Sequence, residues 1–160
     1  MAGPGTVFTG PVQTGTIWNP GDSRGNANVG LAQLAQTITL TQNGASNVSG
    51  ILYVPPGSQI DEFNVDNLVL WNSTTAGLTI GTSPGGNQIW TTTSLLAGTR
   101  LLQATAGYTA TQLTLMQNVG NSPQSVPIYF TVTVTGTASA GTTFITMKYL
   151  QTVQLSAGAA

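Results

Sequence analysis

The sequence predicts an all-β fold: an antiparallel β-sandwich of jelly-roll type in residues 31–160, preceded by an extended N-terminal arm in residues 1–30. Three observations support this prediction. Short runs of alternating apolar and polar residues recur along the chain, turn residues separate them throughout, and no stretch has the pattern of a convincing amphipathic helix. The 160 residues include 20 Gly and 8 Pro, and this length suits one domain with a substantial core.

Residues 1–30 are rich in Gly, Pro, Asn and Thr, as an extended segment would be. Purely disordered segments seldom carry large aromatic or branched apolar residues, whereas residues 1–30 carry several. The alternatives are a mobile terminus and an arm that is ordered by contact with another subunit. The expected contact residues of the arm are Val7, Phe8, Val12, Ile17 and Trp18.

The first half of the sandwich begins with a strand at residues 34–41, where Leu34, Ile38 and Leu40 share a face. Asn43-Gly44 is a tight-turn signal leading toward the next strand. The stretch 50–82 then predicts strand, turn, strand, loop and strand. In residues 63–71 the second half is apolar on both faces, which predicts a central strand that is fully covered there. The predicted strands of this stretch are 51–54, 63–71 and 78–82, the last with a bulge or bend at Gly81.

The second half continues with a β-branched run at residues 88–93 and an ambiguous segment at 95–102, which fits either one helical turn or two strand fragments. Alternation resumes at residues 111–115, which favours another strand. The longest regular pair follows, with apolar residues alternating mainly with threonines in 128–135 and with Thr, Lys and Gln in 145–155. This pattern predicts a β-hairpin close to the C-terminus.

Composition excludes several classes of protein. Only 4% of the residues are charged and the net charge is −1, against roughly 25% charged residues in an ordinary domain. With Arg24, Arg100 and Lys148 as its only cations, the chain is a poor nucleic-acid ligand. No apolar run is long enough to span a membrane, and the N-terminus does not look like a secretory signal. We therefore expect no nucleic acid or membrane as partner, and synthesis in the cytoplasm. A surface of hydroxyls and amides favours a protein packed against neighbours.

The sequence offers little catalytic chemistry. It lacks His and Cys, so no Ser-His-Asp triad and no thiolate site can be assembled. Asp61, Glu62 and Asp66 lie close together, and paired carboxylates can serve a glycosidase or bind calcium; solvated turn residues are the more ordinary interpretation. We expect no enzyme activity, no cofactor and no metal. Aromatic residues that could stack on a sugar, but that are more often core residues, are Trp18, Trp71, Trp90, Tyr53, Tyr108, Tyr129 and Tyr149.

A resemblance to a known family lies in three segments: 52–60 (LYVPPGSQI), 69–74 (VLWNST) and 78–82 (LTIGT). Their succession resembles the head decoration, or capsid cement, proteins of tailed bacteriophages. Those proteins have a β-sandwich body and an extended terminal segment. Trp71 departs from the smaller aromatic expected at its position, which bears on the subfamily. The likeness covers roughly residues 34–155 as a pattern of strands.

The resemblance implies a virion structural protein on the capsid surface, synthesised in the host cytoplasm, that stabilises the shell by bridging adjacent capsomers. The implied partners are the major capsid protein and other copies of this chain, as a homotrimer. The arm would reach onto neighbouring capsid subunits. A carbohydrate-binding or receptor-binding β-sandwich module of a phage tail or fibre is the alternative.

Overall fold

The computed structural model describes residues 30–44, 46–92, 94–96, 101–103 and 108–153. One compact unit comprises residues 33–151, and a second comprises 1–32 with 152–160. The predicted arm, including Val7, Phe8, Val12, Ile17 and Trp18, lies outside the described residues except for its last position. No helix within the described ranges is long and apolar enough to cross a membrane.

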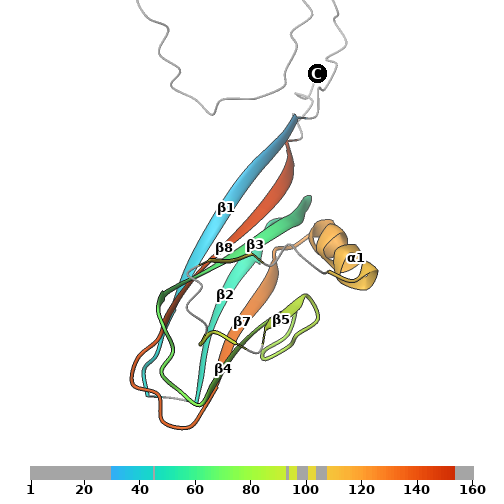
Figure 1. Ribbon diagram of the computed structural model, residues 1–160. Coiled ribbons are helices and arrows are strands. Elements are labelled where there is room, and N and C mark those ends of the chain that lie inside the picture. The colour runs from blue at the N-terminus through green and yellow to red at the C-terminus, as the bar shows by residue number, and fades with distance from the viewer. Residues whose placement is uncertain (1–29, 45, 93, 97–100, 104–107, 154–160) are drawn as a thin grey trace, which may run out of the picture. The chain divides into compact units, whose positions relative to one another are not determined.

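The described chain is built from eight strands and one short helix (Figure 1). The helix α1 spans Ala110–Asn118 and continues into a 3₁₀ turn at Val119–Asn121. The strands are β1 Gly30–Thr41, β2 Asn47–Val54, β3 Ser58–Val69, β4 Thr75–Gly81, β5 Trp90–Thr92, β6 Leu101–Gln103, β7 Val126–Thr135 and β8 Thr142–Val153.

The strands form two four-stranded sheets, in the orders β1-β8-β3-β6 and β2-β7-β4-β5. In these orders β1 lies beside β8, β2 beside β7, β3 beside β6 and β4 beside β5. This nested pairing is what results when a long eight-stranded hairpin rolls up into two sheets, and it defines a jelly roll. The predicted all-β sandwich is therefore confirmed, and its strand order is that of the jelly roll.

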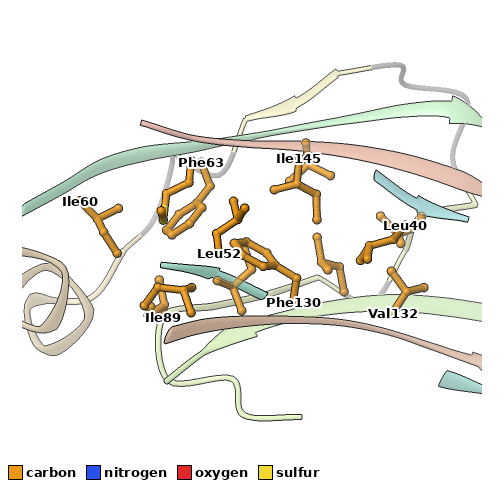
Figure 2. Close-up of a cluster of buried hydrophobic side chains, with 14 of the residues drawn as sticks. Leu40, Leu52, Ile60, Phe63, Ile89, Phe130, Val132 and Ile145 are labelled. Carbon is orange, nitrogen blue, oxygen red and sulfur yellow. The ribbon is translucent and has the colours of Figure 1, made fainter. Parts of the chain in front are cut away.

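The core fills the space between the two sheets. In β7, for example, alternate residues point inward: Ile128, Phe130 and Val132 are fully buried. Figure 2 shows labelled side chains of both sheets pointing into this space, among them Phe63 of β3 and Phe130. These two rings meet edge to face, with centroids 5.8 Å apart and planes at 67°, which is a favourable arrangement for aromatic rings.

The predicted C-terminal hairpin is wrong, although both of its strands exist. β7 pairs with β2 and β4, whereas β8 pairs with β3 and lies beside β1 in the other sheet. The segment between them, with Gly136 and Gly141 both at positive φ, carries the chain across the sandwich. Alternation shows that a strand has one buried face, and that face is the same whichever sheet the strand joins.

The strand expected at residues 111–115 is also wrong, because this segment lies within α1. A capping box begins the helix: the Gln112 backbone N–H donates to Thr109 Oγ1 at 3.3 Å, and the Thr109 N–H donates to Gln112 Oε1 at 2.8 Å. Met116 and Val119, three residues apart, are buried, whereas Leu113 is 44% exposed. The helical spacing of the buried residues outweighs the short alternation.

Residues 63–71 are central, as predicted, since β3 lies between β8 and β6. The expectation that the second half is fully covered is wrong, because Leu68, Val69 and Leu70 are each between 45% and 49% exposed. β3 has register shifts between Ile60 and Glu62 and between Asn67 and Val69. At Gly81, by contrast, the pairing of β4 with β7 stays in register to the end of the strand.

A chain of buried hydrogen bonds begins at Trp71, just after β3. The indole N–H donates to Thr143 Oγ1 at 2.8 Å, and that hydroxyl donates to Asn67 Oδ1 at 2.7 Å. The Asn67 amide donates in turn to the carbonyl of Leu95 at 3.3 Å. Every group in the chain is satisfied, which removes the cost of burying it.

We expect Thr143→Val to destabilise the fold by about 2 to 3 kcal/mol, because it leaves the buried Trp71 N–H and Asn67 amide oxygen without their partner. Urea unfolding followed by tryptophan fluorescence measures this loss. Thr133→Val is the matched control, because Thr133 is exposed and surface changes usually stay within about 0.5 kcal/mol. Equal stability of the two variants would show that the hydrogen-bond chain contributes nothing.

Candidate functional site

The charged side chains of the described residues all belong to one sheet. Asp61, Glu62 and Asp66 lie on β3, and Lys148 lies on β8. The strands β2, β7, β4 and β5 of the other sheet contain no charged residue. The two outer faces of the sandwich therefore differ in kind, and each is a candidate for function.

Asp61 and Glu62 on β3 already have hydrogen-bond or ion-pair partners, and Asp66 lies at a distance from Glu62. Asp61 Oδ2 accepts a hydrogen bond from Gln33 Nε2 at 2.9 Å. Glu62 forms an ion pair with Lys148 and accepts a hydrogen bond from Asn64 at 3.4 Å. Asp66 lies four residues beyond Glu62, which in a strand is about 13 Å, farther apart than the carboxyl pair of a glycosidase.

The Lys148 ion pair determines the charge of Glu62. Its hydrogen bond lowers the pKa of the Glu62 carboxyl, desolvation opposes this, and the charge of Lys148 lowers the pKa further. Glu62 is thus a carboxylate at neutral pH and does not serve as a general acid. Nearby, burial raises the pKa of the Tyr108 hydroxyl, and the charge of Glu62 raises it further. Across the described ranges, no three His, Cys, Asp or Glu side chains are grouped to hold a metal ion.

The aromatic residues divide between core and surface. Trp71 is 2% exposed and Tyr149 is also buried, so neither is available for stacking on a sugar. Trp90 packs partly buried against the core. Tyr53, by contrast, is 53% exposed on β2, and Trp18 lies outside the described residues.

The outer side of the β2-β7-β4-β5 sheet is an uncharged face made largely of hydroxyl side chains. The strand register aligns Ser49, Thr131, Thr79 and Thr91 in one row across the four strands. Neighbouring hydroxyls interact across strands: Ser49 Oγ lies 3.2 Å from Thr131 Oγ1. The residues that make up the uncharged face are Ser49, Ile51, Tyr53, Thr75, Gly77, Thr79, Thr91, Tyr129, Thr131, Thr133 and Thr135.

The uncharged face has two zones. One is a shallow depression of about 350 Å³ around Gly77, lined by threonines of β4, β5 and β7. The other is apolar: Ile51, 41% exposed, lies opposite Tyr129 in the register, and Tyr53 lies opposite Pro127. A face of hydroxyls, apolar groups and no charges can be covered by another surface at low desolvation cost, which suits binding.

Sequence reasoning placed the contact residues in the arm and missed this face. Threonines that alternate with apolar residues, as in residues 131–135, are also what an ordinary solvent-facing strand contains. A signal was available, because residues 101–147 contain no charged side chain and neither do 67–99. Only the fold shows that β4, β5 and β7, which lie in these stretches, join β2 in one sheet.

No protein family and no curated protein sequence matches this chain. Among solved structures it is similar to one described as the capsid of Ralstonia phage GP4. The similarity has 19% sequence identity and a TM-score of 0.45, and it covers 78% of this chain and 86% of that one. A likeness of this strength does not assign a function.

We expect Glu62→Gln to lower the stability at pH 7 by less than about 1 kcal/mol, since the ion pair is partly exposed. The pKa of Glu62 is lowered in the folded state from its usual 4.5. The contribution of the Glu62 carboxylate to folding stability is therefore fully present above pH 4.5, and it is lost as the pH falls through the lower pKa of the folded state. Urea unfolding across pH 2–7 (about one-unit steps) measures this.

A double-mutant cycle with Lys148→Gln is the control for the ion pair. The coupling between the two substitutions should be present at neutral pH and absent in acid. A coupling that is unchanged in acid would contradict an ionic origin.

Proposed function

We propose that this chain is a structural protein of a bacteriophage virion, which decorates the capsid and stabilises it by bridging adjacent capsomers. The observation that carries the proposal is the uncharged face, an exposed sheet surface with hydroxyl and apolar zones and no charge. Charges on a surface keep soluble proteins apart. A sheet without them is suited to lie against another protein.

Two further observations support the proposal. The succession of segments in residues 52–82 resembles phage decoration proteins, and the strand order is that of the jelly roll, a fold used by viral capsid proteins and by lectins. A fold by itself does not decide a function. The chemistry of the surface must therefore distinguish a capsid protein from a lectin.

The mechanism is mechanical. Eight residues of strand are about 26 Å long and four strands about 19 Å wide, so the uncharged face covers about 500 Å². A stable interface buries about 800 Å² on each partner. One face alone would bind a capsomer weakly, and the arm, with the expected contacts Val7, Phe8, Val12, Ile17 and Trp18, would add area on the neighbouring capsomer.

Repetition makes such weak contacts effective. When one chain touches two capsomers, the second contact forms at high effective concentration, so the pair holds far better than either contact alone. Many copies over the shell would then oppose its expansion together. The layer needs no catalytic group, no metal and no cofactor.

The decisive variant is Thr133→Lys, which places a charge in the middle of the uncharged face. We expect at least a tenfold loss of binding to capsids stripped of the protein, because the lysine would have to be desolvated at the interface. Co-sedimentation with the capsids measures the bound fraction. Gln59→Lys adds the same charge at an exposed position of the other sheet and should bind as the unmodified chain does.

Salt dependence provides an independent measurement. Capsid binding through an uncharged surface should change little as the ionic strength rises, whereas binding through charges should weaken because salt screens them. Binding that disappears in high salt, or that survives Thr133→Lys, would contradict a role for this face.

A carbohydrate-binding or receptor-binding module of a tail or fibre is the second candidate, favoured by the exposed Tyr53 ring beside Ile51 and Tyr129. Such a module would lose glycan binding on Tyr53→Ala, since the ring would supply the stacking surface. Mass spectrometry of separated heads and tails of the virus distinguishes the two. Near-stoichiometric abundance in heads supports decoration, and a few copies confined to tails support the receptor module.

A further inference from the structure

The sandwich has four edge strands among its described elements, and they differ greatly in length. β5 and β6 end their sheets with three residues each. β1 and β2 form the other two edges, with 12 and 8 residues. A short edge offers little backbone for pairing, whereas a long one presents a row of N–H and C=O groups to any extended chain.

The edge of β2 is partly covered by a side chain of β1. Gln36 Nε2 donates to the carbonyl oxygen of Tyr53 at 2.8 Å. Pairing of another strand with β2 would have to displace this hydrogen bond.

β1 itself carries none of the residues that usually protect an edge. Its 12 residues, GLAQLAQTITLT, include no charged residue and no proline, the two most common means of blocking edge pairing. Gln33, Leu34, Ala35, Thr37 and Thr39 are exposed. Within the compact unit, residues 33–41 therefore form a long uncharged edge.

We propose that β1 pairs with β1 of a second copy of this chain, so that the β1-β8-β3-β6 sheet continues across a two-fold axis into the same sheet of its partner. Two identical antiparallel strands related by a two-fold axis form an isologous contact, which needs only one self-complementary surface. β1 meets this need, because no like charges would face each other across the pair.

The properties of β1 also indicate which strand would pair with its edge. A strand that adds to an edge must itself be extended and have a free edge, and a second β1 has both properties. The homotrimer that the resemblance implies would need a different contact, in which β1 meets a second long edge. The other described edges are short or partly covered, so the structure favours a pair.

The inference is independent of the proposed capsid role, because it uses the β1 edge and not the uncharged face. The test uses the full chain in a concentration series. Sedimentation equilibrium should show the mass rising from one chain to two. Hydrogen exchange should show slower exchange at high concentration in residues 33–41, for the alternate amides that point away from β8.

The double variant Ala35→Lys with Thr37→Lys places lysines beside those of the partner strand. We expect at least a tenfold rise in the dissociation constant of the pair. Gln59→Lys with Gln124→Lys adds the same charge at exposed positions away from β1 and should associate as the unmodified chain does. Circular dichroism checks that each variant is folded, and the exchange measurement on the unmodified chain tests the inference without any variant.

Four results would overturn the inference: a single-chain mass at every concentration, a trimer, slower exchange confined to other strands, or undiminished pairing of a folded Ala35→Lys/Thr37→Lys variant. Failure of Thr133→Lys to affect capsid binding would leave the pairing intact, since the two experiments address different surfaces.

Discussion

The jelly roll depends on the connections that cross from one sheet to the other, and two of these connections are joined by hydrogen bonds around Trp71. The indole follows β3, where the chain leaves one sheet for the other, and its N–H is satisfied by Thr143 near the start of β8. Asn72, the next residue, accepts hydrogen bonds from the backbone N–H groups of Ser139 and Ala140, both at 2.9 Å. The β3–β4 and β7–β8 crossings therefore hold each other in place.

Close packing at this corner is possible because Gly141 lies directly against the indole. A Cβ on Gly141 would lie 2.4 Å from Trp71 Cδ2, and its φ of 154° is one that other residues rarely adopt. The Trp71 indole therefore packs against Gly141 and hydrogen-bonds to the hydroxyl of Thr143. This packing accommodates the tryptophan at a position where we expected a smaller aromatic residue.

The crossings also separate the charges. Because the chain alternates between sheets, β3 and β8 lie side by side and bring Glu62 and Lys148 together. β2, β4, β5 and β7 gather in the other sheet, where no charge is present. One outer face thus carries an ion pair, and the other carries no charge. The edge of β1 adds a third surface, for which a second copy is the proposed partner.

The fold class, the inward faces of most strands and the shortage of charge can all be predicted from the sequence. These are local properties: alternation in residues 128–134 puts Ile128, Phe130 and Val132 in the core whatever their neighbours are. The short alternation at 111–115 was misleading because helical spacing and the Thr109 capping box extend beyond it. The expected arm contacts remain predictions.

Which strands share a sheet is seen only in the folded chain, because an alternating strand has the same buried face in either sheet. The C-terminal hairpin was wrong for this reason, and the uncharged face and the unprotected β1 edge could not be seen in the sequence. The exposure of Leu68 and Leu70 has the same origin. Whether a residue is covered depends on the elements that pack over it, and these are distant in the sequence.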